Sequence, residues 1–215
     1  MSSPSEEGRE GPKRSSPLRA VSALLSLSDE EAMRRVQDSG DHRAFALLLR
    51  RWEDPIRRLC TRMTGDAHRG EELAQETFTR VFAKRGSYRH QAKFSTFLWR
   101  VAVNLCIDER RRSQVRREVS TGTGEEAGCG DESDLTCAQP PPDRVAERHE
   151  RATLVQEALM ELPEYYRAVV VLRHYEDLKF REIAEVLDIP VGTVKSRMAT
   201  ALTKLSNKLK PLLGR

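Results

Sequence analysis

Apolar side chains recur at helical spacing in the first half of the chain. The clearest stripe runs from Phe45 to Met63 and returns to the same face about every 3.6 residues. Pro55 lies inside this stripe and predicts a kink or a division of the helix. Two more helices are expected over residues 70–84 and 95–112. No useful run alternates with a period of two, so the sequence predicts no sheet.

The second half of the chain predicts four shorter helices. The first carries an apolar stripe from Leu154 to Leu162. Pro163 stands where a second helix can begin, because its missing N–H needs no partner there, and this helix is expected to end near His174. The third and fourth are expected over residues 180–187 and 192–209. The fold class predicted is therefore all-α.

Composition divides the chain into four parts. All aromatic residues lie within 45–99 or 165–180, so a core is expected only there. Residues 1–28 are rich in Ser, Pro and Gly and are expected to be a disordered extension. Residues 113–150 are expected to form a flexible acidic linker whose end, at Pro140–Pro142, is locally extended. Two small helical domains, 29–112 and 151–215, are predicted on either side of it.

The net charge of +4 conceals an uneven distribution. Residues 29–117 carry 20 Lys and Arg against 13 Asp and Glu, whereas residues 118–150 carry nine acids and two arginines. Every charge after Asp188 is positive. Two basic blocks around an acidic spacer indicate a polyanion contacted at two places. Ordinary solvated helix faces would carry the same charges, so this pattern alone leaves both interpretations open.

The segment 180–199 has the pattern of a helix-turn-helix, with a tight turn at 188–191. The face of its second helix opposite the apolar stripe holds short polar groups flanked by cations, which suit base edges and phosphates. The start of that helix offers free backbone N–H groups for a phosphate. A plain helical hairpin with a solvated face is the alternative. The candidate residues are Gly192, Thr193, Lys195, Ser196, Arg197 and Thr200.

A second candidate site interleaves aromatic residues with cations over 88–112. Unpaired bases stack on ring faces while cations follow the backbone, so this composition suits single-stranded nucleic acid. Phe94 and Phe97 are expected in the core instead. Trp99 lies off the apolar stripe and is the better candidate for a base contact. In the alternative interpretation the aromatic residues are core and the arginines merely surface.

Three segments, 65–82, 94–112 and 162–197, resemble bacterial sigma factors of the sigma-70 family. The first resembles region 2, the second the part of region 2 that melts and reads the −10 promoter element, and the third region 4, which reads the −35 element. A chain with only these two regions is similar to the extracytoplasmic function (ECF) subfamily. Lys179 departs from the family pattern, because a Ser commonly caps that helix, and a weaker cap is expected.

The resemblance implies specific partners for specific residues. Core RNA polymerase would be bound at its clamp helices by region 2 and at its flap by region 4, and an anti-sigma factor would hold the chain inactive by covering both domains. The loop 89–96 would capture a flipped base of the −10 element. The clamp-helix residues would be Glu72, Leu73, Gln75, Glu76 and Phe78. The −10 residues would be Lys93, Ser95, Thr96, Trp99, Arg100, Asn104, Asp108, Arg111 and Arg112.

The function predicted is that of an alternative sigma factor, active on the nucleoid in the bacterial cytoplasm. The main alternative is a helix-turn-helix operator-binding regulator that does not bind core polymerase, and a third is an adaptor without nucleic acid. No glycine-rich phosphate loop, HExxH or GxSxG motif is present, so no enzyme is expected. No apolar run approaches about 18 residues, so no membrane contact is expected.

No cofactor or metal is expected either. Cys129 and Cys137 lack the close CxxC pairing of a structural zinc site, and a redox-responsive linker remains a weaker hypothesis. Cys60 and Cys106 are expected to be free thiols in the core.

Overall fold

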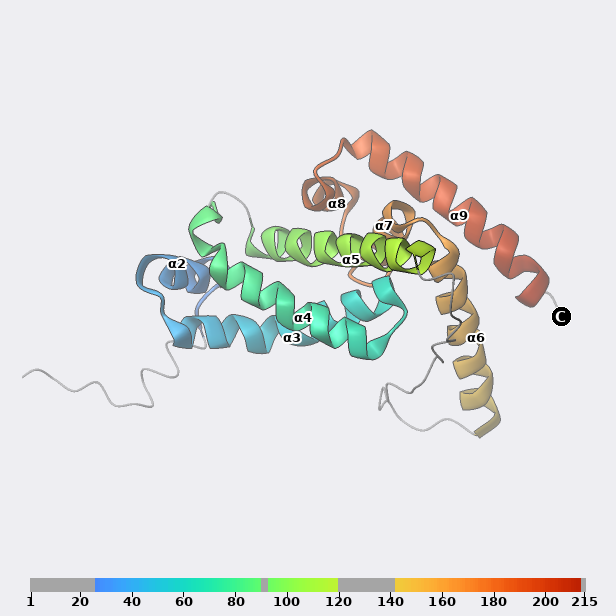
Figure 1. Cartoon of the computed structure of the whole chain (residues 1–215), viewed down its shortest axis with the longest axis horizontal. Helices are drawn as coiled ribbons and strands as arrows, with labels where there is room; N and C mark the ends of the chain where they lie inside the picture. Colours follow the sequence, from blue (N-terminus) through green and yellow to red (C-terminus); the bar gives the residue numbers. More distant parts are fainter. Residues whose placement is uncertain (1–25, 90–92, 120–141, 214–215) are drawn as a thin grey trace, which may run out of the picture.

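The computed structural model describes residues 26–89, 93–119 and 142–213. Every regular element in these ranges is helical, which confirms the all-α prediction (Figure 1). The elements are α2 (Asp29–Ser39), α3 (His42–Thr64), α4 (Ala67–Ala83), the 3-10 helix η1 (Arg85–Ser87), α5 (Phe94–Val119), α6 (Pro142–Glu161), α7 (Glu164–His174), α8 (Phe180–Leu187) and α9 (Val191–Leu213).

Side-chain caps set the starts of the first three helices. The Ser28 hydroxyl accepts from the Glu31 N–H, and the carboxylates of Asp41 and Asp66 accept from the first-turn N–H groups of α3 and α4. Such caps satisfy N–H groups that have no partner within the helix. Helices α2 and α3 end at Gly40 and Gly65, both left-handed with φ of 65° and 79°.

Helix α3 continues through Pro55, so the predicted division of this helix is wrong. A proline removes one helix hydrogen bond, but the fully buried Ile56 and Leu59 follow it and hold the next turns against the core. Helix α2 carries too short an apolar pattern to be predicted, with Ala32, Met33 and Val36 as its buried residues.

Helices α3 and α4 pack closely because α4 carries Gly70 where it meets Thr61. A Cβ atom at position 70 would lie 2.3 Å from the Thr61 hydroxyl oxygen and 2.7 Å from its backbone nitrogen. Only a residue without a side chain fits at that distance. This contact sets the spacing of the two helices that line the groove described below.

The boundaries predicted for the N-terminal extension and the linker need correction. Leu27 falls within the expected disordered extension, yet it is buried, and its carbonyl accepts a hydrogen bond from Arg51. Helix α5 extends to Val119, and α6 begins at Pro142 rather than near residue 151. Pro142 is thus the first residue of a helix, where proline is well tolerated, and not part of an extended end. The remaining linker residues, 120–141, lie outside the described part of the chain.

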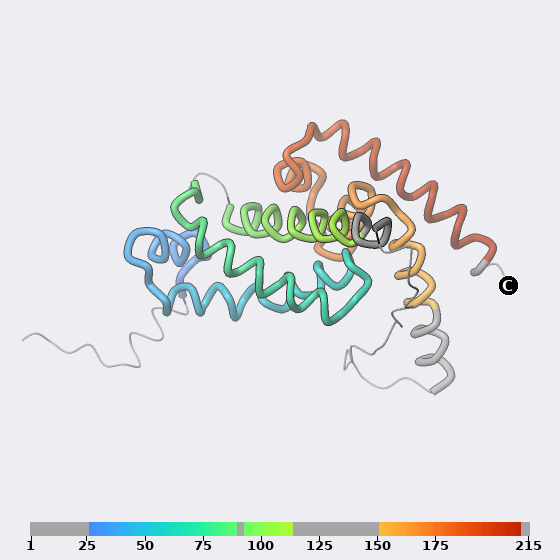
Figure 2. Tube along the Cα trace, in the orientation of Figure 1, coloured from blue at the N-terminus to red at the C-terminus, as the bar shows by residue number. Residues whose placement is uncertain are grey.

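Helices α6–α9 pack against the first four helices rather than standing apart from them. Helix α5 contacts α2, α3 and α4 on one side and α7 and α8 on another, as the ribbon and the chain trace both show (Figures 1 and 2). One continuous apolar cluster extends from Leu27 to Ala201. Because α5 is covered on several sides, its buried residues are not confined to one apolar stripe.

Two thiols lie inside this core, as predicted. Cys60 on α3 and Cys106 on α5 are buried and free of disulfide bonds. A hydrogen bond with Cys60, together with burial, raises the pKa of the Cys106 thiol well above its usual value. No described helix combines the length and apolar character needed to cross a membrane.

Candidate functional site

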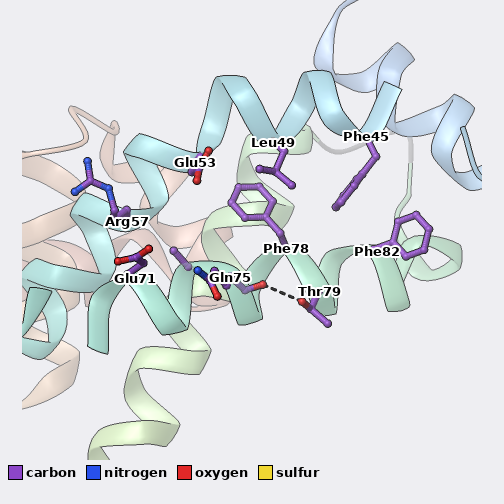
Figure 3. Close-up of a pocket in the computed structure, with 10 residues that line it drawn as sticks. Phe45, Leu49, Glu53, Arg57, Glu71, Gln75, Phe78, Thr79 and Phe82 are labelled. Atoms are coloured by element: carbon purple, nitrogen blue, oxygen red, sulfur yellow. Dashed lines mark hydrogen bonds between the residues drawn. The ribbon is translucent and has the colours of Figure 1, made fainter. Parts of the chain in front are cut away.

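An apolar groove of about 600 Å³ opens between α3 and α4. Phe45 and Leu49 line it from α3, and Phe78 and Phe82 line it from α4, with the rings of Phe45 and Phe82 5.1 Å apart (Figure 3). Ala74 also lines it, and the polar residues of the lining are Glu53, Arg57, Glu71, Gln75 and Thr79. An apolar floor with a polar rim is a surface suited to burying the side chains of another protein.

The candidate polymerase-binding residues are distributed over three parts of α4. Gln75 lies exposed at the groove. Leu73 and Phe78 are buried, with 4% and 5% exposure, so they support the surface of α4 from beneath and offer little of their own side chains to a partner. Glu72 and Glu76 belong instead to a polar crevice between α4 and α5.

The polar crevice is crossed by ion pairs. Arg69 bonds to both Glu72 and Glu109, the latter at 2.7 Å, and these hydrogen bonds raise the pKa of the Arg69 guanidinium. Glu76 pairs with Arg80 at 2.7 Å. Arg69 therefore ties α4 to α5, which fixes the direction in which the exposed face of α4 points.

The groove-lining residues of α3 were not identified as site residues from the sequence. Phe45 and Leu49 belong to the apolar stripe that predicted α3, and the stripe does not distinguish a core position from a groove position. They remain half-buried because α4 covers only part of their side of α3. Their position beside an exposed part of α4 distinguishes them from core residues, and this position becomes visible only once the packing of α4 on α3 is known.

Most candidate residues for the −10 element lie on one face of α5. Lys93, Arg100, Asn104 and Arg111 are exposed at spacings of seven, four and seven residues, which keeps them on one side of the helix. Asp108 is half-buried on the same side, Ser95 is half-buried near the start of the helix, and Arg112 is exposed at the polar crevice.

Trp99 and Thr96 do not fit the base-contact interpretation. Trp99 is only 4% exposed and packs edge-on against Trp52, with ring centroids 5.6 Å apart. Thr96 is 6% exposed. Both positions lie off the stripe that predicted α5, but both are covered, Trp99 by Trp52 of α3, so neither side chain is available to a base in this arrangement.

The aromatic neighbours of Trp99 are core residues, as expected. Phe94 is fully buried and packs against Tyr88 and Trp52. Phe97 packs against the ring of Tyr88 at 5.5 Å. Aromatic residues in this segment therefore stabilise the first unit, and the exposed groups along α5 are its polar and cationic side chains.

The helix-turn-helix has the predicted arrangement. Helix α8 ends at Leu187, Asp188 adopts a left-handed conformation with φ of 54°, and α9 begins at Val191. On α9, Val194, Met198 and Ala201 are buried against the core. The opposite face is polar, with Gly192, Lys195, Ser196 and Thr200 exposed and Thr193 and Arg197 half-buried.

The hydroxyl groups on that polar face already donate to the backbone. Ser196 donates to the Thr193 carbonyl and Thr200 to the Ser196 carbonyl, each at 3.0 Å. Their oxygens keep free lone pairs as acceptors. Arg197 is turned aside and lies over the ring of Tyr165, 5.2 Å from its centroid. The freely presented cation of the predicted set on α9 is therefore Lys195.

The start of α8 is capped without a Ser. The backbone N–H of Lys179 donates to Glu182 Oε2 at 2.9 Å, which is the Glu half of a capping box. Among the described residues, no group of three His, Cys, Asp or Glu side chains is arranged to hold a metal ion. Cys129 and Cys137 lie outside the described residues.

Comparisons with known proteins agree with this arrangement. The family descriptions "Sigma-70 region 2" and "Sigma-70, region 4" match residues 48–116 and 152–205. The ECF RNA polymerase sigma factor SigW of Bacillus subtilis is 35% identical over 173 residues, 80% of this chain and 92% of that protein. The RNA polymerase sigma-H factor of Pseudomonas aeruginosa is 33% identical over 190 residues, 88% of this chain and 98% of that protein.

Two solved structures share the fold. One is the sigma factor RpoE from Bartonella quintana, in complex with the anti-sigma factor NepR, with a TM-score of 0.61 at 19% identity over 77% of this chain and 96% of that one. The other is CnrH in complex with the cytosolic domain of CnrY. Its TM-score is 0.62 at 22% identity, over 85% of this chain and 97% of that one.

The chain has two helical regions, the second of which contains a helix-turn-helix, and both match regions of sigma-70. This places the protein in the class of sigma-70-type transcription initiation factors. The chain belongs to the ECF subfamily of the sigma-70 family.

Proposed function

We propose that this ECF sigma factor binds core RNA polymerase and directs transcription initiation at promoters with specific −10 and −35 elements. The observation that carries the proposal is the presence of two separate polar and cationic faces, one on α5 and one on α9, together with an apolar groove between α3 and α4. Two DNA contacts and one protein contact are what a promoter-specificity subunit needs. No catalytic group is required, because binding energy separates the strands.

The polymerase contact is the exposed ridge of α4 and the adjoining groove. Glu72, Gln75 and Glu76 are exposed at helical spacing along the ridge, and the groove beside Gln75 takes apolar side chains of the clamp helices. Region 4 makes the second contact, at the flap. Buried Leu73 and Phe78 support the ridge from beneath. This assignment widens the predicted set by adding Phe45 and Leu49 from α3.

The promoter contacts follow from which candidate side chains are exposed. Lys93, Arg100, Asn104 and Arg111 track the melted −10 strand along α5. Ser95, Asp108 and Arg112 flank that path, whereas the buried Trp99 and Thr96 do not. Gly192 and Thr193 offer backbone N–H groups to a phosphate of the −35 duplex, while Lys195, Ser196, Arg197 and Thr200 approach its bases and backbone.

An anti-sigma factor is the third proposed partner. Both solved relatives described above share the fold, and one of them, RpoE from Bartonella quintana, is bound to the anti-sigma factor NepR. The groove between α3 and α4 offers an apolar surface to such a protein, in competition with polymerase.

Run-off transcription tests the proposal. Bacterial core polymerase is incubated with genomic fragments, with and without the purified chain, and discrete new transcripts that share two upstream elements are expected. If the chain does not bind core polymerase but does bind duplex operators, the helix-turn-helix regulator replaces the sigma factor. If it binds neither, the adaptor interpretation remains.

A groove variant separates polymerase docking from folding. Thr79→Arg places a long cation at the groove edge and is expected to weaken binding to core polymerase by about tenfold or more, the loss typical of a buried charge at an interface. Ser39→Arg makes a comparable change at an exposed position on α2 that does not line the groove, and should bind as the unmodified chain does. Equal affinities for the two variants would exclude the groove as the docking surface.

A further inference from the structure

Helix α2 contacts both ends of the connection between η1 and α5. On the η1 side, Gln37 Nε2 donates to the carbonyl oxygens of Gly86 and Tyr88, at 3.3 Å each. On the α5 side, Glu30 Oε1 accepts from the backbone N–H of Phe94, the first residue of that helix, at 3.1 Å. Glu30 and Gln37 are seven residues apart, which is about two helical turns, so they share one face of α2. One helix therefore bridges the two ends (Figure 1).

Glu30 supplies a cap that the start of α5 lacks in its own sequence. Lys93 directly precedes the helix, and its ammonium group has donors but no acceptor for a helix N–H. The first N–H groups of a helix have no partner within it, and a negative charge is favourable beside them. The carboxylate that bonds to Phe94 comes from α2 instead. This bond between helices fixes the point at which α5 begins.

Packing alone does not account for a glutamine at position 37. Gln37 Oε1 is buried and, within the described ranges, has no hydrogen-bond partner. An unsatisfied buried acceptor destabilises a fold, and an apolar side chain of similar length would avoid that cost. What the amide adds is a donor that two backbone carbonyls share, and these two bonds tie η1 to α2.

The ring of Tyr88 joins the two ends of the connection. Tyr88 is 3% exposed and packs against Phe94 and Phe97, with ring centroids 6.1 and 5.5 Å away. Burial, and then the nearby charges of Glu30 and Asp29, raise the pKa of Tyr88 to about 12, so its hydroxyl stays neutral beside the acidic start of α2. The two ends are therefore packed together as well as hydrogen-bonded to one helix.

Helix α2 is itself fastened to α3. The two carboxylate oxygens of Asp29 accept separately from Arg51 and from the indole N–H of Trp52, each at 2.8 Å. Met33 and Val36, on the other side chains of the same helix, are fully buried in the core. The groups that α2 holds are therefore held in a fixed position relative to α3.

We propose that Glu30 and Gln37 are positioning residues for promoter recognition. They hold the backbone on either side of the η1–α5 connection, so that the neighbouring side chains of Arg89, Lys93 and Ser95 meet a −10 base in one fixed arrangement. The inference rests on the proposed function, which takes the start of α5 as part of the −10 site. In this assignment neither Glu30 nor Gln37 contacts DNA.

The physical argument is that recognition needs an ordered site. Arg89 directly follows the carbonyl that Gln37 holds, and Lys93 directly precedes the N–H that Glu30 holds. Discrimination between ligands requires donors and acceptors held within about 0.5 Å of their working positions. A connection with loose ends adapts to a wrong base as well as to the right one. Loss of either contact should therefore reduce discrimination between bases more than it reduces transcription from every promoter.

Amide hydrogen exchange tests the contact in the free chain. The first N–H of a helix has no helical partner and is ordinarily among the fastest to exchange. The Phe94 amide, followed by NMR, is expected to exchange about tenfold or more slowly than an unfolded chain does. Glu30→Ala should remove this protection, whereas Glu30→Gln keeps an acceptor oxygen and should retain most of it. An unprotected Phe94 amide in the unmodified chain, or protection that Glu30→Ala leaves unchanged, would overturn the proposal.

Base discrimination in transcription tests the consequence. Core polymerase assembled with each variant transcribes a promoter found by the run-off experiment, and matched templates in which one −10 base is changed. The measured quantity is the ratio of initiation rates on the original and changed templates, because a purely structural role would lower both rates together. Glu30→Ala and Gln37→Met are each expected to reduce this ratio about fivefold or more at one or more −10 positions. Glu30→Gln should preserve most of it.

Two variants elsewhere provide matched controls. Glu31→Ala removes the neighbouring carboxylate, which lies 3.6 Å from Arg35 instead. Gln156→Met removes an amide bond of the same kind, from Gln156 Nε2 to the Arg62 carbonyl at 3.4 Å. Both should leave the ratio and the exchange of the Phe94 amide unchanged. Circular dichroism and the affinity for core polymerase report whether each variant folds and assembles.

The outcomes separate this inference from the proposed function. If Glu30→Ala loses the protection at Phe94 but keeps the full ratio, α2 only supports the fold and the proposal is wrong. Gln37→Met conserves side-chain length and decides the test if Glu30→Ala does not fold. If the unmodified chain supports no transcription, the proposed function fails, while the exchange result for the contact in the free chain still stands.

Discussion

Arg167 Nη1 donates a 2.6 Å hydrogen bond to the backbone carbonyl of Met63, across the boundary between the two helical units. The same guanidinium donates to the carbonyls of Leu159, Met160 and Leu162. These carbonyls belong to the C-terminal ends of α3 and α6, where the last carbonyls of a helix lack partners and a positive charge is favourable. Burial lowers the pKa of Arg167 to about 10, so the side chain stays charged at neutral pH.

Arg167→Lys is expected to lower the free energy of unfolding by about 3 kcal/mol. A lysine keeps the charge, but its ammonium group has three donors on one atom and cannot reach four carbonyls spread over two helices. Urea unfolding followed by circular dichroism measures the change. Arg173→Lys, at a partly exposed site on the same helix, is the control and should cost under about 1 kcal/mol. Similar losses in both variants would refute the special role of Arg167.

Gly65→Ala and Gly40→Ala separate backbone strain from contact between the units. Both glycines end a helix at positive φ, so an alanine at either is expected to cost about 1–2 kcal/mol. Only at position 65 would the new Cβ meet another side chain, 2.7 Å from the Met160 sulfur on α6. Gly65→Ala should therefore cost roughly 1 kcal/mol more. Denaturation midpoints that coincide would show that α6 does not rest on Gly65.

Trp99→Ala distinguishes a core role from a base contact. Removal of a buried tryptophan is expected to cost about 3–5 kcal/mol, because Trp99 packs against Trp52 inside the first unit. Asn104→Ala, exposed on the same helix, should leave stability within about 0.5 kcal/mol. Thermal unfolding of the two variants gives the comparison. A stable Trp99→Ala protein that has lost promoter melting would restore the base-contact interpretation.

Glu176 introduces a pH dependence at the boundary between the units. Burial raises the pKa of this carboxyl above its usual value of 4.5, against the opposing effects of Arg62 and Arg58. The folded state therefore binds the proton more tightly than the unfolded state does. The resulting stabilisation is complete below about pH 4.5 and is lost as the pH rises through the higher pKa of the folded state.

Glu176→Gln removes this titration. As the pH rises from about 4.5, the unmodified protein should lose stability relative to the variant, as measured by urea midpoints at each pH. The difference between a neutral carboxyl and an amide at this site adds an offset that does not depend on pH, so the slope of the difference is the quantity to compare. The raised pKa would be contradicted if the difference in stability between the two proteins did not change with pH, or if the unmodified protein gained stability relative to the variant as the pH rose.

Local periodicity accounts for what the sequence predicted well. Phe180 to Leu187 and the helix after the turn fold as expected, because a helix-turn-helix is set by near neighbours: an apolar stripe, a left-handed residue at Asp188 and a second stripe. Phe94, Cys60 and Cys106 are likewise expected in the core and are buried. In each case the decisive pattern lies within a few turns of one helix.

The errors arise where distant segments meet. Trp99 and Thr96 lie off the main stripe of α5 and are nevertheless covered, because that helix is packed on more than one side. Leu27 lies at the end of a segment whose Ser, Pro and Gly content predicts disorder, and composition alone does not mark it as buried. The groove residue Leu49 resembles any other stripe position until the placement of α4 is known. Periodicity identifies a buried face but not how many partners will cover it.

The facing thiols of Cys60 and Cys106 give the protein a native reporter of motion in its core. An alkylating reagent reacts with a thiolate, and these thiols are buried between α3 and α5, with the pKa of Cys106 raised. Modification therefore requires the two helices to part, so its rate under native conditions measures how often they do. Since α5 also supports the second unit, comparing that rate with and without a bound partner follows the whole assembly without an introduced label.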